Sequence, residues 1–334
     1  GLNARIRAFY GRNQTGSNPQ AMSALIKSTA SVGSMTLLSR LLGLARDIVI
    51  ARFFSASDAA DAFFVAFKIP NFLRRLFAEG AFSLAFVPVL TEYRNNYTTA
   101  QTRDLIDRVA GTLGLILLLL SLFGVVASPL LISVFAAGFI DQPAKFDLTA
   151  DMLRITFPYI LLISMTAMAG GMLNTWKRFA VPAFTPVLLN LSLIGCAMYL
   201  SPHLELPITA LAWGVLIAGV VQLLFQLPFL YREGLLPRPK WGWRHEGVQK
   251  IIRLMIPALF GSSVAQINLL FDTFIASFLV TGSVSWLYYS DRLLEFPLGV
   301  FGIALATVVL PNLSEAHYKK GATHFNDTLR WAIP

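Results

Sequence analysis

Four long stretches of this sequence contain no charged residue, and they limit what the chain can fold into more than any other feature. They are Val109–Ile140, Ile155–Trp176, Phe179–Leu204 and Leu206–Tyr231. A helix needs about 20 predominantly apolar residues to cross a bilayer. Core helices of soluble domains are seldom this long and this apolar, so these stretches predict transmembrane helices.

The whole chain is poor in charge, as a membrane protein should be. Charged residues make up 13% of the 334 positions and hydrophobic residues 55%, whereas soluble domains carry about 25% charged residues. We therefore expect an all-α, polytopic membrane protein. The predicted spans are Ser28–Phe54, Asp58–Leu90, Val109–Ala137, Leu148–Trp176, Val181–Leu200, Ile208–Leu230, Val248–Leu279 and Val284–Leu310, with a ninth beginning near Phe325.

The distribution of basic residues predicts the orientation of the chain. Residues 1–21 form a polar N-terminal extension without the apolar core of a signal peptide, and Met22 resembles a natural start. Of the loop lysines and arginines, only Arg52 and Lys145 fall on one side, and all others fall on the side of the N-terminus. This positive-inside pattern predicts a cytoplasmic N-terminus. It also accounts for the net charge of +9 without a nucleic-acid partner.

A weak internal repeat suggests two lobes. Val87–Glu92 and Leu310–Glu315 are similar in sequence and 223 residues apart, and the same offset relates Lys68 to Asp291. So short a pattern can recur by chance, but the offset also equals six predicted spans. We expect residues 22–247 to form a six-helix N-lobe and residues 248–334 to begin a C-lobe that is truncated in this chain. Parallel repeats of this kind build transporters whose halves move about a central site.

Charges inside four predicted spans, the first, second, seventh and eighth, point to a water-filled cavity. The second span alone carries five, which are Asp61, Lys68, Arg74, Arg75 and Glu79. A charge at the bilayer centre costs about 2.5–3.5 kcal/mol on insertion scales, so five facing lipid would cost on the order of 15 kcal/mol. These side chains must therefore face water or one another. Structural ion pairs and functional contacts are equally good interpretations for Asp47, Asp61, Lys68, Arg75 and Glu79.

Four intramembrane arginines favour a functional interpretation. They are Arg40, Arg46, Arg74 and Arg292. The planar guanidinium binds two phosphate oxygens at once, which an ammonium cannot do. An anionic pyrophosphate fits four such groups better than a neutral sugar or a cationic drug does. We therefore expect these arginines to bind an anionic head group.

The charged motifs also carry a family resemblance. Ser39–Asp47, Asp61–Asn71, Leu73–Phe82 and Ser285–Pro297 closely resemble the MurJ (MviN) family. This family belongs to the multidrug/oligosaccharidyl-lipid/polysaccharide exporter superfamily. The resemblance implies a two-lobed fold of fourteen helices with a central cationic cavity, in the bacterial cytoplasmic membrane. It also implies alternating access that moves lipid II, a peptidoglycan precursor, from the inner to the outer leaflet.

The resemblance assigns roles to individual residues. It implies substrate binding by Arg40, Arg46, Arg74 and Arg292, and supporting or gating roles for Asp61, Ser285 and Glu295. Some relatives bind sodium in the second lobe, and Asp272 is a candidate ligand; a helix–helix contact explains a lone intramembrane Asp equally well. No other cofactor is implied. The implied partners are lipid II, membrane lipids and the cell-wall synthesis machinery.

Three other functions remain open at this point. A drug exporter of the same superfamily would need an acidic cavity. An integral-membrane enzyme acting on polyprenyl phosphates would need clustered acids or histidines, whereas the four histidines are scattered in predicted loops. A scaffold subunit would leave the intramembrane arginines unexplained. We therefore expect a transporter rather than an enzyme.

Overall fold

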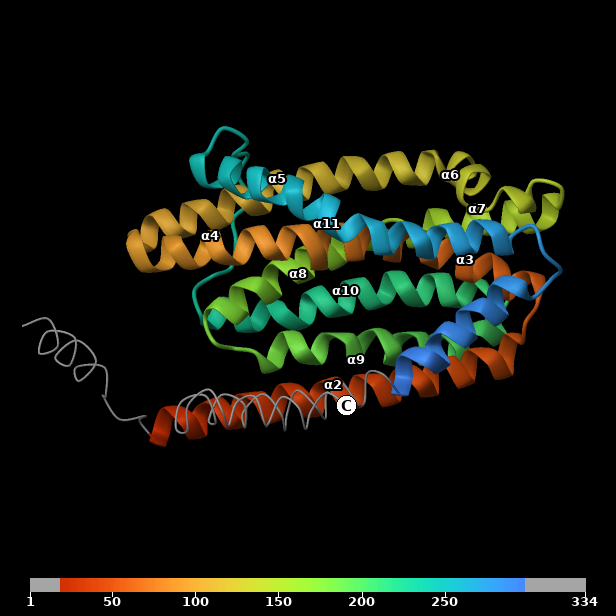
Figure 1. The fold of residues 1–334 in the computed structure, drawn as a ribbon, viewed down its shortest axis with the longest axis horizontal. Coiled ribbons are helices and arrows are strands. Elements are labelled where there is room, and N and C mark those ends of the chain that lie inside the picture. Colours follow the sequence, from red (N-terminus) through yellow and green to blue (C-terminus); the bar gives the residue numbers. More distant parts are fainter. Residues whose placement is uncertain (1–18, 298–334) are drawn as a thin grey trace, which may run out of the picture.

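The computed structural model describes residues 19–297, and every regular element in that range is a helix. The long helices run side by side in one bundle (Figure 1). They are α2 (Pro19–Phe54), α3 (Asp58–Leu73), η1 (Arg74–Phe82), α4 (Ser83–Asn96), α5 (Thr99–Val126), α6 (Ser128–Phe135), η2 (Ala137–Phe139), α7 (Pro143–Thr156), α8 (Tyr159–Thr175), α9 (Ala180–Gly195), η3 (Cys196–Leu200), η4 (Ser201–His203), α10 (Thr209–Arg232), α11 (Glu246–Ala276) and a helical stretch at 283–297. The predicted end of the eighth span and the start of the ninth lie outside the described residues.

Four helical segments in this range are long and apolar enough to cross a bilayer. They are Thr99–Val126, Pro143–Thr175, Ala180–His203 and Thr209–Arg232, and a fifth is obtained if the two halves of α11, bent by 50°, count as one span. The other three predicted spans correspond to α2, to α3–η1–α4 and to the stretch at 283–297. These helices are shorter, interrupted or more polar, and they carry the intramembrane charges discussed above.

Several helix boundaries differ from the sequence prediction for local reasons. The first helix begins at Pro19 rather than Ser28, since proline suits the first turn of a helix and the following residues extend it. The helix predicted from Val109 begins at Thr99, because Thr98 and Gln101 form a reciprocal capping box. The predicted third span ends early, at Val126, and a separate α6 begins at Ser128 with a proline in its first turn.

A buried hydroxyl compensates for the proline inside α3. Pro70 has no N–H, so the carbonyl of Ala66 loses the helical hydrogen bond that residue 70 would normally donate. Thr156 Oγ1, from the end of α7, donates to this carbonyl at 3.0 Å. Thr156 is fully buried. The π-helical segment η1 follows directly, from Arg74 to Phe82, so the helix changes its period just where the basic residues lie.

Helix α3 lies at the centre of the hydrophobic core. Its residues from Ala60 to Phe67 are all buried, which means that neighbours cover it on every face. The large buried side chains of this core include Phe63 of α3 itself and Phe157 and Tyr159 from outside it. Asp61, on this buried segment, is therefore held against protein and cannot turn towards lipid.

Candidate substrate site

Asp61 anchors a cluster of hydrogen bonds at one end of the bundle. Its carboxylate is 1% exposed and lies in the first turn of α3. Oδ1 accepts the backbone N–H of Ser285 at 2.9 Å and its Oγ at 2.6 Å, and Oδ2 accepts the N–H of Gly282 at 2.8 Å. Both backbone donors belong to the start of the helical stretch at 283–297, where a negative charge is favourable.

Lys145 completes this cluster from α7. Its Nζ lies 3.0 Å from Asp61 Oδ2 and 2.9 Å from Asp58 Oδ1. The side chain is 5% exposed and its ammonium lies 4.3 Å from the centre of the Phe139 ring. Thr281 Oγ1 also donates to Asp58, at 2.9 Å. We call this group, Asp58, Asp61, Lys145, Thr281, Gly282 and Ser285, the Asp61 cluster; it joins the chain before residue 150 to the chain after residue 280.

A second cluster lies deeper in the bundle around Arg46. Both Arg46 and Asp47 are buried, and the guanidinium reaches Asp47 Oδ1 from Nε at 2.9 Å and from Nη2 at 2.6 Å. Nη2 also donates to the Tyr288 hydroxyl at 2.9 Å, and Nη1 donates to Asn190 Oδ1 at 3.0 Å. The Tyr288 hydroxyl in turn donates to Asp47 Oδ1 at 3.1 Å. Arg46 therefore has its donors occupied by α2, α9 and the stretch at 283–297.

Arg292 and Glu295 extend this cluster along the same helical stretch. Arg292 Nη1 donates to Glu295 Oε2 at 2.9 Å, and its Nε lies 3.9 Å from Asp47 Oδ2. Its guanidinium also lies over the Tyr288 ring, 5.4 Å from the ring centre. The Arg46 cluster thus comprises Arg46, Asp47, Asn190, Tyr288, Arg292 and Glu295.

Arg40 lies beside the Arg46 cluster and has spare hydrogen-bonding capacity. Its Nη1 donates to the Glu295 carbonyl at 3.4 Å. Its Nε is buried and, within the described residues, has no hydrogen-bond partner. Arg40, Arg46, Arg292 and Glu295 together line a cavity of about 80 Å³. The structure therefore brings three of the four predicted arginines to one place.

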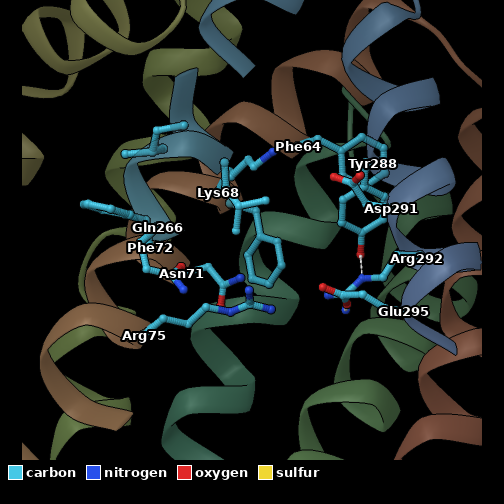
Figure 2. Close-up of a pocket in the computed structure, with 13 residues that line it drawn as sticks. Phe64, Lys68, Asn71, Phe72, Arg75, Gln266, Tyr288, Asp291, Arg292 and Glu295 are labelled. Atoms are coloured by element: carbon cyan, nitrogen blue, oxygen red, sulfur yellow. Dashed lines mark hydrogen bonds and ion pairs between the residues drawn. The ribbon is translucent and has the colours of Figure 1, made fainter. Parts of the chain in front are cut away.

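A neighbouring cavity lies between α3, the start of η1, α11 and the stretch at 283–297. Figure 2 shows Lys68, Asn71 and Arg75 facing Tyr288, Asp291, Arg292 and Glu295 across it. Its volume is about 60 Å³. Arg292 and Glu295 line both cavities, so the two adjoin. Lys68 and Arg75, for which ion pairing was an equally good interpretation, thus face the same space as the predicted binding residues.

The fourth predicted arginine lies next to this space without lining it. Arg74 Nε donates to Asn71 Oδ1 at 2.9 Å, and Asn71 is one of the lining residues. The residues that line the two cavities include five cations and three carboxylates, which leaves an excess of positive charge. The cations are Arg40, Arg46, Lys68, Arg75 and Arg292, and the carboxylates are Asp47, Asp291 and Glu295.

Asp272 is exposed on α11, apart from both clusters. Its nearest charged neighbours include Lys68 and Asp291, with which it interacts electrostatically. Among the residues that the structure describes, no three His, Cys, Asp or Glu side chains gather into a metal site. A sodium site at Asp272 therefore remains a prediction.

Sequence reasoning assigned no site role to six residues of these clusters, which are Asp58, Lys145, Asn190, Thr281, Gly282 and Tyr288. Asn190 and Tyr288 are neutral, and a neutral polar residue inside an apolar helix gives little signal. Lys145 did give one, because it is one of only two basic residues on its side of the predicted membrane.

Comparison with known proteins places this geometry in a family. The family model described as lipid II flippase MurJ matches residues 50–334. The chain belongs to the MurJ family. A probable lipid II flippase MurJ from Vibrio cholerae is 58% identical over 92% of this chain and 60% of its own length, and one from Haemophilus influenzae is 52% identical over 90% and 61%.

Solved structures agree with the MurJ assignment and show the wider fold. A lipid II flippase MurJ in an inward closed conformation matches with a TM-score of 0.74 at 30% identity, over 90% of this chain and 62% of that one. A multidrug resistance MATE family transporter of the MOP superfamily, in an outward-facing conformation, matches with a TM-score of 0.55 at 16% identity, over 92% and 69%. The chain is thus a multi-pass, all-α membrane protein with the MOP transporter fold. It spans about 60% of the length of its curated MurJ relatives.

Proposed function

We propose that this chain is part of a flippase that moves lipid II from the inner to the outer leaflet of the bacterial cytoplasmic membrane. The observation that carries this proposal is the gathering of Arg40, Arg46 and Arg292 at one cavity within a MurJ-family fold. Guanidinium groups bind a pyrophosphate bidentately. The polyprenyl tail would stay in the bilayer, and no bond would be broken, so the protein would not act as an enzyme.

In this proposal the N-terminus lies in the cytoplasm and the Asp61 cluster lies at the periplasmic face. The cluster would then close the outer end of the transport path in this conformation. The two cavities at the arginines are far smaller than a glycolipid head group, with volumes of about 60 and 80 Å³. Substrate entry would therefore require the helices around Arg46 to move apart, as alternating access demands.

We also propose the two-lobe division, with residues 22–247 as the N-lobe and residues 248–334 as the start of the C-lobe. Two contacts support the repeat that suggests it. Asp58 and Thr281, 223 positions apart, are hydrogen-bonded. Lys68 and Asp291, separated by the same offset, line one cavity. Equivalent positions of two repeats are expected to meet near the pseudo-symmetry axis of a transporter.

The membrane potential could help to drive such a cycle. An elementary charge crossing 100 mV changes in energy by about 2.3 kcal/mol. With the cytoplasm negative, an anionic head group would be driven outwards and an emptied cationic cavity inwards. A sodium ion at Asp272 and contacts with the cell-wall synthesis machinery are further parts of this proposal.

The decisive experiment measures lipid II on the outer surface of cells that depend on the full-length protein. We expect Arg292→Ala to abolish labelling of outer-leaflet lipid II at unchanged protein level. Arg154→Ala is a matched control, because among the described residues this half-exposed arginine pairs only with Asp151, at 2.5 Å. Normal labelling in the Arg292→Ala cells would refute the assignment.

Export of organic cations is the second candidate, since MATE transporters share the fold. The excess of positive charge around the arginines opposes it, because like charges repel such a ligand. Proton- or sodium-dependent uptake of a cationic dye into inverted vesicles, with unchanged lipid II labelling, would favour this candidate. Covalent change in added lipid II would instead indicate an enzyme.

A further inference from the structure

A larger, apolar cavity lies away from the arginines, between α5, α8 and α10. Its volume is about 410 Å³, and only Ala, Gly, Leu, Met and Pro residues line it. Leu118 of α5 belongs to the lining and is 44% exposed, and its neighbours Leu119 and Leu122 are more exposed still. This face of α5 is therefore open to its surroundings, which for a membrane-spanning helix are lipid chains.

The segment between α10 and α11 closes one end of this cavity. We call residues 234–245 the linker, and its Pro237 and Pro239 are among the lining residues. Figure 1 shows it at the end of the bundle where α5 and α11 begin, opposite to the end where α3 begins. In the proposed orientation this end is cytoplasmic.

The linker is held in place on α5 by hydrogen bonds, three of which its own backbone N–H groups donate. The N–H groups of Arg238 and Lys240 donate to Asp107 Oδ1 at 2.8 Å and to its carbonyl at 3.0 Å. The N–H of Gly242 donates to Thr112 Oγ1 at 3.0 Å. The backbone packs so closely that a Cβ at Gly111 would lie 2.2 Å from the Lys240 carbonyl oxygen. The mouth of the cavity is therefore preformed.

The linker carries the residues typical of a membrane–water interface. Trp241 and Trp243 stack with their ring centres 6.2 Å apart, and they are 57% and 42% exposed. Tryptophan is enriched at this depth of the bilayer. Pro237 and Pro239 of the same linker line the apolar cavity, so the two tryptophans place this segment at the level of the lipid head groups.

Two arginines of the linker are available to bind an anion. Arg238 and Arg244 are exposed, and neither pairs with a carboxylate among the residues that the structure describes. Their basic neighbours Lys240 and Arg108, in contrast, do pair with carboxylates. Lys240 Nζ lies 3.2 Å from Asp107 Oδ2, and Arg108 Nε lies 2.7 Å from Asp104 Oδ2. The uncompensated charge of the linker is thus concentrated on two guanidinium groups.

We propose that the linker and this cavity bind one anionic phospholipid of the adjacent leaflet. An acyl chain occupies the cavity, Arg238 and Arg244 bind the phosphate group, and Trp241 and Trp243 pack at the level of the glycerol. Lipid is favoured over a protein partner because the cavity opens through the lipid-facing side of α5. The site shares no lining residue with the arginine cavities, so it is separate from the proposed substrate site.

Tryptophan fluorescence tests this proposal directly. The full-length protein in detergent is titrated with phosphatidylglycerol brominated near the head group, and with brominated phosphatidylethanolamine for comparison. We expect quenching by phosphatidylglycerol at a concentration several-fold lower. A Trp241→Phe, Trp243→Phe variant should lose this component, which assigns the quenching to the linker.

Three variants separate the head group from the chain. Arg238→Gln with Arg244→Gln should raise the half-quenching concentration of phosphatidylglycerol about tenfold or more, because each basic residue near the surface adds to lipid attraction. Arg52→Gln with Arg154→Gln removes two arginines at the opposite end and should change nothing. Gly114→Leu should fill the cavity, since a Cβ at Gly114 meets nothing closer than Met165 Sδ at 4.0 Å, and should abolish the quenching in a protein that remains monodisperse.

Three results would overturn the proposal. Equal quenching by the two lipids would show that no anionic head group is recognised. An equal effect of the control pair Arg52→Gln and Arg154→Gln would show attraction by net charge alone. Unchanged quenching in the Gly114→Leu variant would show that the chain lies elsewhere.

Discussion

Ser285 donates two hydrogen bonds to the same carboxylate oxygen of Asp61, one from its backbone N–H at 2.9 Å and one from its Oγ at 2.6 Å. The two residues are 224 positions apart. A single buried carboxylate therefore fixes the start of the helix that carries Tyr288, Arg292 and Glu295. The closure of this end of the bundle is therefore coupled to the position of the arginines.

Substitution of Asp61 should loosen this end of the bundle. Asp61→Asn removes the charge that the N–H groups of Gly282 and Ser285 bind, and hydrogen bonds to charged groups contribute about 1.5–3 kcal/mol. We expect amide hydrogen exchange in peptides covering 281–288 to become about tenfold faster or more. Asp151→Asn is the control, because its partner Arg154 is exposed. Unaltered exchange at 281–288 would show that Asp61 does not hold this helix.

Loss of Lys145 should destabilise the protein more than loss of any surface lysine. Lys145→Met leaves the buried carboxylate of Asp61 without its cation, and breaking a buried pair in this way costs about 3–5 kcal/mol. Arg154→Met, at an exposed pair, should cost less than about 1 kcal/mol. The midpoint of thermal unfolding in detergent measures both.

A second substitution should reverse part of the Lys145 effect. In the Lys145→Met, Asp61→Asn double variant no unpaired buried charge remains, so the loss in stability should be smaller than in Lys145→Met alone. Additive losses would mean that the two side chains do not interact energetically.

Gly282 should tolerate no side chain. Its φ of 92° lies in the region that residues with a Cβ rarely adopt, and a Cβ there would lie 3.0 Å from the Ala56 carbonyl oxygen. We expect Gly282→Ala to cost about 1–2 kcal/mol in unfolding free energy. Gly195→Ala, in open space at the end of α9, should cause no loss. Equal stability of the two variants would contradict this account.

The hydroxyl of Thr156 should contribute more to the stability of the protein than its small size suggests. Thr156→Val removes the donor that satisfies the Ala66 carbonyl, and an unsatisfied buried group costs about 1–3 kcal/mol. Pro70→Ala restores a backbone N–H to that carbonyl, so the double variant should recover part of the loss. Thermal unfolding of the single and double variants checks both statements.

The sequence predicted the helical bundle and much of the candidate site because both depend on local composition. A long apolar stretch without charge predicts a membrane helix, whichever helices it packs against. Charges inside a span must face water or one another, and the chemistry of the guanidinium group favoured an anion site at Arg40, Arg46, Arg74 and Arg292. The family motifs implied separate supporting or gating roles for Asp61 and Ser285. They did not predict the hydrogen bonds between the two residues.

The unpredicted features depend on tertiary contacts or on an irregular helix. Lys145 lies far from Asp61 in sequence, and no periodicity relates them. Asp61, Lys68 and Arg75 are spaced seven residues apart, which would place them on one face of a regular α-helix. In the structure Asp61 belongs to the Asp61 cluster, Lys68 and Arg75 line the cavity beside Arg292, and η1 begins at Arg74 with a wider π-helical turn. The spacing of Arg75 and Glu79 also allows an i, i+4 ion pair, but the Glu79 side chain lies outside the described part of the structure.

The Arg46–Asp47 pair has a consequence for any measurement of substrate affinity. An arginine whose donors are bound to Asp47, Asn190 and Tyr288 cannot bind a phosphate until it releases them. Asp47 therefore acts as an internal competitor, and the measured dissociation constant is the intrinsic one divided by the fraction of molecules in which the guanidinium is released. Asp47→Asn should tighten binding of lipid II to the full-length protein, as titration in detergent would show, while slowing turnover; unchanged affinity would contradict this. The pair would thus set an upper limit on the affinity of the resting protein for its substrate, and so ensure that the substrate can dissociate.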